Sequence, residues 1–229
     1  MEYFIKEIYK DEYLKSACIF SDNIYNYIIT CNDNYVSNEK IKVINYKLKM
    51  VEEINDSNER KFFTDTYYDN KKSTIYIITG NLGYIKSYDY NNNKIYQKYN
   101  HKDDSFHESL LINKNKDIIQ LIDSCIDGTI RIWDFHLGLI LNKITVEYFH
   151  LYGICLYKNG NNEYLFAGSS EKNIILIDLK KQKVVNILQG HNDEVLSVKT
   201  IIKTEYEDLL ISQGFFEDGI NIWSIKKYE

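Results

Sequence analysis

Short runs of apolar residues, separated by turn-forming Asn, Asp and Gly, recur along the whole chain. A clear example is TIRIWDF at residues 129–135, which follows the dipeptide Asp127–Gly128 and contains the pair Trp133–Asp134. β-Branched and aromatic residues favour extended backbone, whereas Asn, Asp and Gly favour tight turns. This pattern predicts an all-β protein built from many short strands.

The pattern of this segment occurs five times at nearly constant spacing. Related segments occupy residues 40–46, 84–90, 173–179 and 219–225. The residue pairs equivalent to Trp133–Asp134 lie 44 to 46 residues apart, at Ile44–Asn45, Tyr88–Asp89, Trp133–Asp134, Ile177–Asp178 and Trp223–Ser224. A period in the forties, filled with short strands and turns, is typical of the four-stranded blade of a β-propeller, in which neighbouring blades cover each other's apolar faces.

The repeat resembles that of the WD-repeat family over essentially the whole chain, in five units. A second marker of the family is a Gly-His pair ahead of the innermost strand of a unit. Gly190–His191 supplies it in the fifth unit and His101 supplies a weaker version in the third. Each of these histidines lies 32 residues before the Trp of its own unit, and this agreement is independent of the repeat itself.

The resemblance implies a hydrogen-bonded chain inside a blade, formed by this His, an Asp in the turn before the third strand, a Ser or Thr in the second strand, and the Trp. A buried Trp N–H needs an acceptor, and a His can accept on one ring nitrogen while it donates from the other. Asp123 replaces the hydroxyl residue in the third unit, and an extra residue in the fifth unit makes Glu217 an alternative to Asp218. Carried over residue by residue, the resemblance assigns His101, Asp127 and Trp133 to the third unit and His191, Ser212, Asp218 and Trp223 to the fifth.

The expected architecture is a single domain over residues 1–229, a closed β-propeller of five four-stranded blades. The segment YFIKEIY at residues 3–9 is expected to pair with the last blade, which would otherwise lack an outer strand, and so to close the ring. WD-repeat rings most often have seven blades, and this chain is too short for seven. Two alternatives therefore stay open: an open ring completed by strands of a partner, and one part of a larger protein.

The resemblance implies a non-enzymatic scaffold that binds other proteins, as a subunit of a larger assembly. In the family, partner contacts cluster on the loops before the innermost strand and between the second and third strands. Two adjacent Phe side chains in such a loop cannot both easily turn inward, so Phe215 and Phe216 are candidate binding anchors, and the alternative is that one or both pack between blades. The candidate partner-binding residues in these loops are Asp103, Asp104, Ile126, Asp193, Phe215 and Phe216.

Composition and charge narrow the partners and the compartment. The formal net charge is −5, with acids and bases mixed along the chain, so we expect neither nucleic acid nor a membrane surface as the partner. The N-terminus lacks a secretory signal pattern, and no apolar stretch is long enough to cross a membrane. We expect a cytoplasmic protein, with a nuclear location left open, whose cysteines are reduced core thiols: Cys18, Cys31, Cys125 and Cys155.

Sites for catalysis or for a bound cofactor have little support in the sequence. None of the five histidines has the spacing of a metal-ligand set, and no glycine-rich phosphate-binding turn opens a helix. We expect no metal, no cofactor and no small-molecule substrate. The enzyme alternative is a five-bladed glycoside hydrolase, but the acidic pairs lack a catalytic context: Glu52–Glu53, Asp103–Asp104 and Glu217–Asp218.

Overall fold

The structure is a computed structural model, and it describes the greater part of the chain. The described residues are 14–21, 24–32, 40–45, 47–55, 63–80, 83–100, 107–114, 118–146, 150–202, 207–217 and 219–225.

The described strands form five antiparallel sheets, each made of strands that are consecutive in the chain. Blade 1 contains β1 (Leu14–Ser21), β2 (Asn26–Asn32), β3 (Lys40–Asn45) and β4 (Met50–Asn55). Blade 2 contains β5 (Phe63–Asp69), β6 (Thr74–Gly80), β7 (Tyr84–Asp89) and β8 (Lys94–Asn100). Blade 3 contains β9 (His107–Lys114), β10 (Ile119–Cys125), β11 (Thr129–Asp134) and β12 (Ile140–Thr145). Blade 4 contains β13 (Leu151–Asn159), β14 (Asn162–Ser169), β15 (Asn173–Asp178) and β16 (Lys183–Gln189), and blade 5 contains β17 (Val195–Ile201), β18 (Asp208–Gly214) and β19 (Asn221–Ile225).

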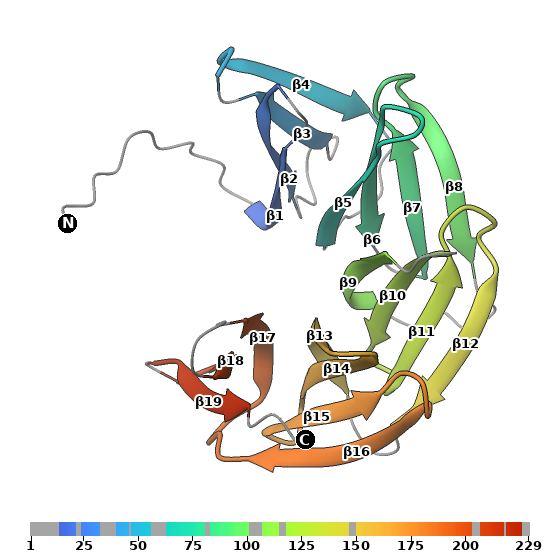
Figure 1. Cartoon of the computed structure of the whole chain (residues 1–229). Helices are drawn as coiled ribbons and strands as arrows, with labels where there is room; N and C mark the ends of the chain where they lie inside the picture. Colours follow the sequence, from blue (N-terminus) through green and yellow to red (C-terminus); the bar gives the residue numbers. More distant parts are fainter. Residues whose placement is uncertain are drawn as a thin grey trace.

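The five sheets stand around a central axis, with the first strand of each blade innermost and the last strand outermost (Figure 1). This arrangement is a β-propeller, and it confirms the all-β fold and the five units predicted from the repeat. The blades follow one another in chain order, so each of the five repeats found in the sequence corresponds to one blade. The segment at residues 3–9, which is expected to add a strand to blade 5, lies outside the described residues.

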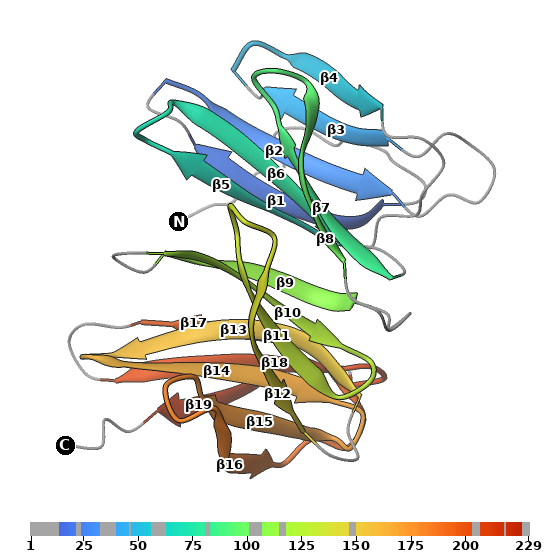
Figure 2. The same ribbon diagram turned by 90° about the vertical axis from the view of Figure 1, so that its right-hand side faces the viewer.

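The innermost strands run in the same direction, so equivalent turns of all blades lie at the same end of the ring (Figure 2). We call the end at the left of Figure 2 the lower end; there the first strand of a blade is joined to the second and the third to the fourth. The upper end carries the connections between second and third strands and between successive blades. Any property shared by equivalent turns is therefore concentrated on one face of the molecule.

The inner edges of the blades are joined by hydrogen bonds that repeat with the period of the fold. Strand edges that face the axis have backbone groups without a partner in their own sheet, and side chains from the neighbouring blade supply these partners. Between a side chain and a backbone group, successive innermost strands are joined by Thr64 N–H to Ser16 Oγ at 3.2 Å, Ile112 N–H to Asp65 Oδ2 at 3.1 Å, Ile154 N–H to Ser109 Oγ at 3.4 Å, and Thr200 Oγ1–H to the Leu156 carbonyl at 3.1 Å.

Four apolar cores lie between adjacent blades, and each takes its residues from both of the blades that it separates. Ile132 points from blade 3 into the core shared with blade 4, whereas its neighbour Trp133 points into the core shared with blade 2. Because successive side chains of a strand point to opposite faces, a strand between two neighbours must be apolar on both faces. This requirement explains the nearly continuous apolar runs of the repeat.

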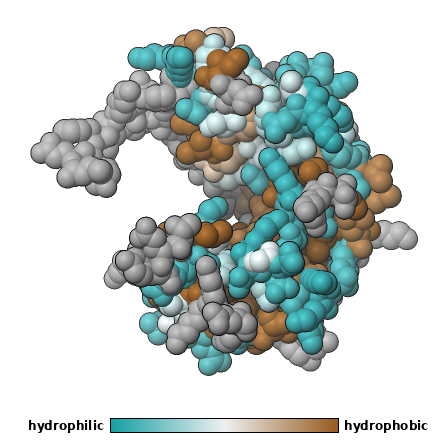
Figure 3. Space-filling view, viewed as in Figure 1, coloured by the Kyte–Doolittle hydropathy of each residue, from teal (hydrophilic) through white to brown (hydrophobic). Residues whose placement is uncertain are grey.

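Blades 1 and 5 do not share such a core among the described residues. Figures 1 and 3 show an opening between the described strands of these two blades, whereas the other blades pack against one another. The described part of the molecule is therefore an arc of five blades, with one sheet face of blade 1 and one of blade 5 turned toward the opening.

Candidate functional site

Blade 5 contains a chain of hydrogen bonds that runs from the interior to the upper end. Trp223 donates its indole N–H to Ser212 Oγ at 2.8 Å, and Ser212 Oγ lies 2.7 Å from Nε2 of His191. The other ring nitrogen of His191 lies 2.5 Å from Glu217 Oε2. Of the residues expected in this network, the structure brings together His191, Ser212 and Trp223, and Glu217 occupies the position of the acid. Asp218 lies outside the described residues.

Glu217 also anchors the loop that carries His191. Its Oε1 accepts the backbone N–H of Asn192 at 2.5 Å. The hydrogen bond from Asn192 and that from the His191 ring hold the pKa of Glu217 below its usual value. The connection before β17 and the connection before β19 are thus tied together by one carboxylate.

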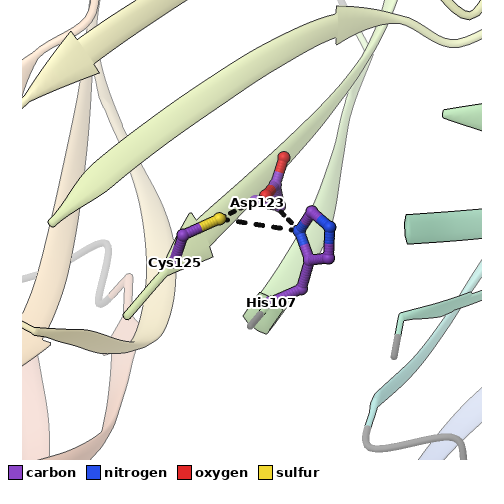
Figure 4. Close-up of side chains that lie close together, drawn as sticks. All are labelled: His107, Asp123 and Cys125. Atoms are coloured by element: carbon purple, nitrogen blue, oxygen red, sulfur yellow. Dashed lines mark hydrogen bonds and ion pairs between the residues drawn. The ribbon is translucent and has the colours of Figure 1, made fainter. Parts of the chain in front are cut away.

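Blade 3 has a related network in which a carboxylate stands where blade 5 has a hydroxyl (Figure 4). Asp123 Oδ1 accepts the indole N–H of Trp133 at 2.5 Å, and Asp123 Oδ2 lies 2.7 Å from Nδ1 of His107. The histidine of this network is His107, at the start of β9, and the expected His101 lies outside the described residues. Asp127 accepts hydrogen bonds from Arg131 at 2.7 Å and from the Thr129 N–H at 3.0 Å. Its expected contact with His101 involves a residue outside the described part of the chain.

The pKa and the hydrogen bonds of Asp123 indicate that this network has a structural role. Burial alone would raise the pKa of Asp123, but the hydrogen bonds from His107, Cys125 and Trp133 outweigh it and hold the pKa below its usual value. Both oxygens of the buried carboxylate are engaged, which compensates for its removal from water.

His107, Asp123 and Cys125 also have the composition and proximity of a metal-ligand set, and within the described ranges they form one such group. Their contacts argue against this use. Arg131 Nη1 donates to Cys125 Sγ, which places a guanidinium cation against the atom that would have to bind the metal. Burial and the nearby Asp123 charge raise the pKa of the Cys125 thiol, so the thiolate that zinc requires is disfavoured. The residues present do not fit a metal, and they act together as a hydrogen-bonded core.

The connection between β18 and β19 holds Phe215 and Phe216 outward at the upper end. Phe216 is 81% exposed and Phe215 is 55% exposed, and their rings meet edge to face with centroids 4.3 Å apart. The backbone N–H of Phe215 donates to the Glu194 carbonyl at 2.9 Å, and that of Phe216 donates to Asp193 Oδ2 at 3.3 Å. Asp193 therefore fixes the backbone of the loop, and its side chain is directed toward that loop.

The remaining residues expected in partner-binding loops are farther along the ring or outside the described part. Ile126 lies in the turn after β10 and is half-buried, and Asp103 and Asp104 are not among the described residues. Two contacts that the sequence pattern did not single out support the loop before β17. Tyr152 Oη–H donates to Glu194 Oε2 at 2.9 Å, and Lys172 Nζ donates to the Asn192 carbonyl at 2.9 Å. Both contacts come from blade 4, so no local pattern in the sequence could have predicted them.

Comparison with known proteins supports the fold. No family model and no curated protein matches the sequence. Among solved structures, the chain is similar to the WD40 β-propeller domain of Doa1, with a TM-score of 0.70 and 15% sequence identity. The similarity covers 91% of this chain and 62% of the Doa1 chain. In the described ranges, no helix has the length and apolar character needed to span a membrane. With this similarity added to the five repeats and the radial sheets, the chain has the fold of a WD40-type β-propeller.

Proposed function

We propose that the protein is a non-enzymatic protein-interaction scaffold, a subunit of a larger assembly that binds a partner protein at its upper end. The observation that carries this proposal is the outward position of Phe215 and Phe216. Single exposed apolar residues are common on protein surfaces, but two adjacent rings held by backbone hydrogen bonds form a preorganised anchor. Because Asp193 and the Glu194 carbonyl fix the loop before binding, little conformational entropy is lost when a partner covers the rings.

The residues that could carry chemistry favour a structural role over an enzymatic one. A propeller glycosidase needs two carboxyl groups about 5–10 Å apart, facing a substrate. On the innermost strands, both oxygens of Asp65 are engaged by backbone N–H groups, of Thr66 at 2.7 Å and of Ile112 at 3.1 Å. The carboxylates of Asp123 and Glu217 are likewise engaged within their blades. The proposal also includes a cytoplasmic location. The free thiols of all four cysteines support it, because disulfides are rare in that compartment.

The test is the recovery of partner proteins by the tagged chain from an extract, with and without the substitutions Phe215→Ala and Phe216→Ala made together. We expect the double variant to lose the partner while its thermal unfolding is unchanged, since both side chains are exposed. A matched control is the pair Leu137→Ala and Leu139→Ala, which removes two apolar side chains of 63% and 60% exposure at the lower end. Equal recovery by both double variants, whether full or reduced, would contradict a role of the Phe pair as the anchor.

A second candidate function is that of an open ring that a partner chain completes with strands of its own. The observation that favours this alternative is the exposure of the residue that precedes the Trp in each repeat. Ile132 in blade 3 is 4% exposed because blade 4 covers it, whereas the equivalent Ile222 in blade 5 is 63% exposed. Ile201 on the same face of blade 5 is 45% exposed, and Ile19 on blade 1 is 78% exposed. These faces have the composition of an interface between blades.

The two candidates predict different results for Ile222→Glu. If a partner's sheet packs against blade 5, the charge would lie in an apolar interface and recovery of the partner would be lost. If the partner binds only through the loop of Phe215 and Phe216, Ile222→Glu would leave recovery intact and the double Phe variant would abolish it.

A further inference from the structure

The lower end of the ring presents an unusual density of lysine. Every blade from the first to the fourth has at least one exposed lysine in or beside the turns at this end, although the chain as a whole has a formal charge of −5. In the described ranges, the exposed lysines at this end are Lys47, Lys49, Lys71, Lys72, Lys94, Lys114, Lys158, Lys180, Lys181 and Lys183.

The carboxylates of the same turns point inward, because the turns themselves use them. Asp69 accepts the backbone N–H of Lys71 at 3.0 Å, Asp89 accepts that of Asn92 at 3.0 Å, and Asp178 accepts that of Lys181 at 2.8 Å. These three aspartates are 7%, 7% and 4% exposed. An aspartate that satisfies turn N–H groups stabilises the turn and is withdrawn from the surface. Among the described residues of the lower end, exposed lysines therefore outnumber exposed carboxylates.

One groove at this end combines the lysines with apolar surface. It lies between blades 3 and 4 and has a volume of about 730 Å³. Lys114 comes from the end of β9, Lys158 from the end of β13 and Lys180 from the turn after β15, and one carboxylate, Glu163, also faces the groove. These three ammonium groups and one carboxylate leave a formal charge of +2.

Glu163 reduces the positive charge of the groove only in part. It accepts hydrogen bonds from Lys158 Nζ at 2.8 Å and from Asn113 Nδ2 at 3.1 Å. Burial opposes its ionisation, but these two bonds hold its pKa below the usual value. Glu163 thus fixes Lys158 at the edge of the groove, and the Lys114 ammonium lies 5.2 Å from the centre of the Tyr67 ring on β5. A cation–π contact leaves the ammonium charge in place, so Lys114 and Lys180 both remain to attract an anionic ligand.

The rest of the groove is lined by apolar side chains and by the side-chain amides of Gln and Asn residues. Leu141 on β12 is 45% exposed and lines the groove together with Ile132 and Leu179, and the side-chain amides of Gln120 and Asn142 lie beside them. Phosphate groups of nucleic acid or lipid are bound by charge and need no apolar surface beside the cations. Apolar residues surrounded by lysines and amides fit a peptide, whose backbone binds amides and whose side chains supply both charge and apolar contact.

We propose that the groove between blades 3 and 4 binds an acidic peptide segment of a partner protein, with an aliphatic or aromatic side chain against Leu141 and Leu179 and with Asp or Glu residues near Lys114 and Lys180. This surface is at the opposite end of the ring from Phe215 and Phe216. It gives the scaffold a second binding site whose existence does not depend on the first.

The probe is a fluorescein-labelled octapeptide in which a Leu-Phe pair is flanked on each side by three acidic residues, and binding is measured by fluorescence anisotropy. We expect saturable binding that weakens as salt is added. The double variant Lys114→Glu and Lys180→Glu is expected to weaken it at least about tenfold, since reversed charges repel the peptide. The matched control reverses two lysines of the same end outside the groove, Lys47→Glu and Lys49→Glu, and should bind as the unchanged protein does.

Further measurements decide the class of ligand. Replacing the Leu-Phe pair of the probe by Ser-Gly, or Leu141 of the protein by Ser, should each weaken binding if the apolar surface is used. Equal affinity for the Ser-Gly probe, equal loss with the Lys47 and Lys49 control, or no binding of the probe would overturn the proposal. Tighter binding of single-stranded RNA or of phosphatidylserine vesicles through Lys114 and Lys180 would also overturn it, because the surface would then recognise phosphate.

Discussion

Trp223 and His191 share one hydroxyl group: Ser212 Oγ lies 2.8 Å from the indole nitrogen and 2.7 Å from Nε2 of the imidazole. An indole nitrogen can only donate, so the serine oxygen accepts from Trp223. The ionised Glu217 can only accept, so Nδ1 of His191 carries a proton and donates to it, and Nε2 of the neutral ring accepts the serine hydrogen. The four groups form one ordered chain of donors that starts in the core and ends at the upper surface.

Ser212→Ala removes the only group that links the two halves of this chain. The Trp223 N–H and His191 Nε2 would lose their partner inside the blade, and an unsatisfied buried polar group costs about 1–3 kcal/mol. We expect the free energy of unfolding, measured by urea denaturation, to fall by an amount of that order. Ser197→Ala in the adjacent strand removes an exposed hydroxyl and should change it by less than about 0.5 kcal/mol. Equal effects of the two substitutions would show that the shared hydroxyl contributes no stability.

Asp123→Asn tests the corresponding position of blade 3 through its pH dependence. The pKa of Asp123 is lowered in the folded protein, so its charge adds stability above the unfolded aspartate pKa of about 3.9, and this stability is lost as pH falls through the folded pKa. We expect Asp123→Asn to be less stable than the unchanged protein by about 3–5 kcal/mol near neutral pH, because it removes the carboxylate 3.8 Å from the buried Arg131 guanidinium. The difference should narrow below about pH 4.

Urea denaturation as a function of pH measures this difference directly. Glu171→Gln, at an exposed turn of blade 4, serves as the control and should show little difference at any pH. A deficit of Asp123→Asn that stays constant from neutral to acidic pH would mean that the charge of Asp123 is not what stabilises the network.

The repeat could be predicted from the sequence because the features that define a strand are local. The pair Ile177–Asp178 has no Trp, yet its apolar run and turn residues identify the third strand of blade 4 as clearly as Trp133–Asp134 does for blade 3. Each such run is apolar on both faces, and the period of the turns reveals the blade. These local features of the sequence were therefore enough to predict the fold.

The partners of individual side chains could be predicted less well, because they depend on packing between strands. His107, at the start of β9, reaches Asp123, and no feature of the repeat singled it out. His101, which the repeat did single out, lies outside the described residues. The support that Tyr152 gives to the loop before β17, and the groove that joins Lys114 to Lys180, each combine two blades. Such contacts depend on how neighbouring sheets pack against each other, and no short segment of the sequence determines that packing.

Gly168→Ala tests the close approach of blades 4 and 5. A Cβ at Gly168 would lie 2.1 Å from the backbone oxygen of Val195, on the innermost strand of the next blade. Backbone cannot move aside as a flexible side chain can, so the methyl group would push the blades apart, at a cost of about 1–3 kcal/mol. We expect a lower midpoint of thermal unfolding. Gly219→Ala is the matched control, since no atom of the described residues lies within 4 Å of the place that its methyl group would take, and a similar loss in both variants would contradict the steric explanation.

Cys155 provides a test of the core between blades 4 and 5 through thiol chemistry. Burial raises the pKa of this thiol from about 9 to about 12, against the opposing effect of Lys199, and a similar pKa of about 12 holds for Cys18. Since the thiolate is the reactive form, we expect both cysteines to react with an aromatic disulfide reagent at pH 8 far more slowly in the folded protein than in urea. The raised pKa also means that the stability contributed by the neutral thiol is present below pH 9 and is lost as pH rises toward 12. Reaction of Cys155 at the same rate with and without urea, identified by mass spectrometry of the labelled peptide, would show that the inner strands of blades 4 and 5 do not shield it.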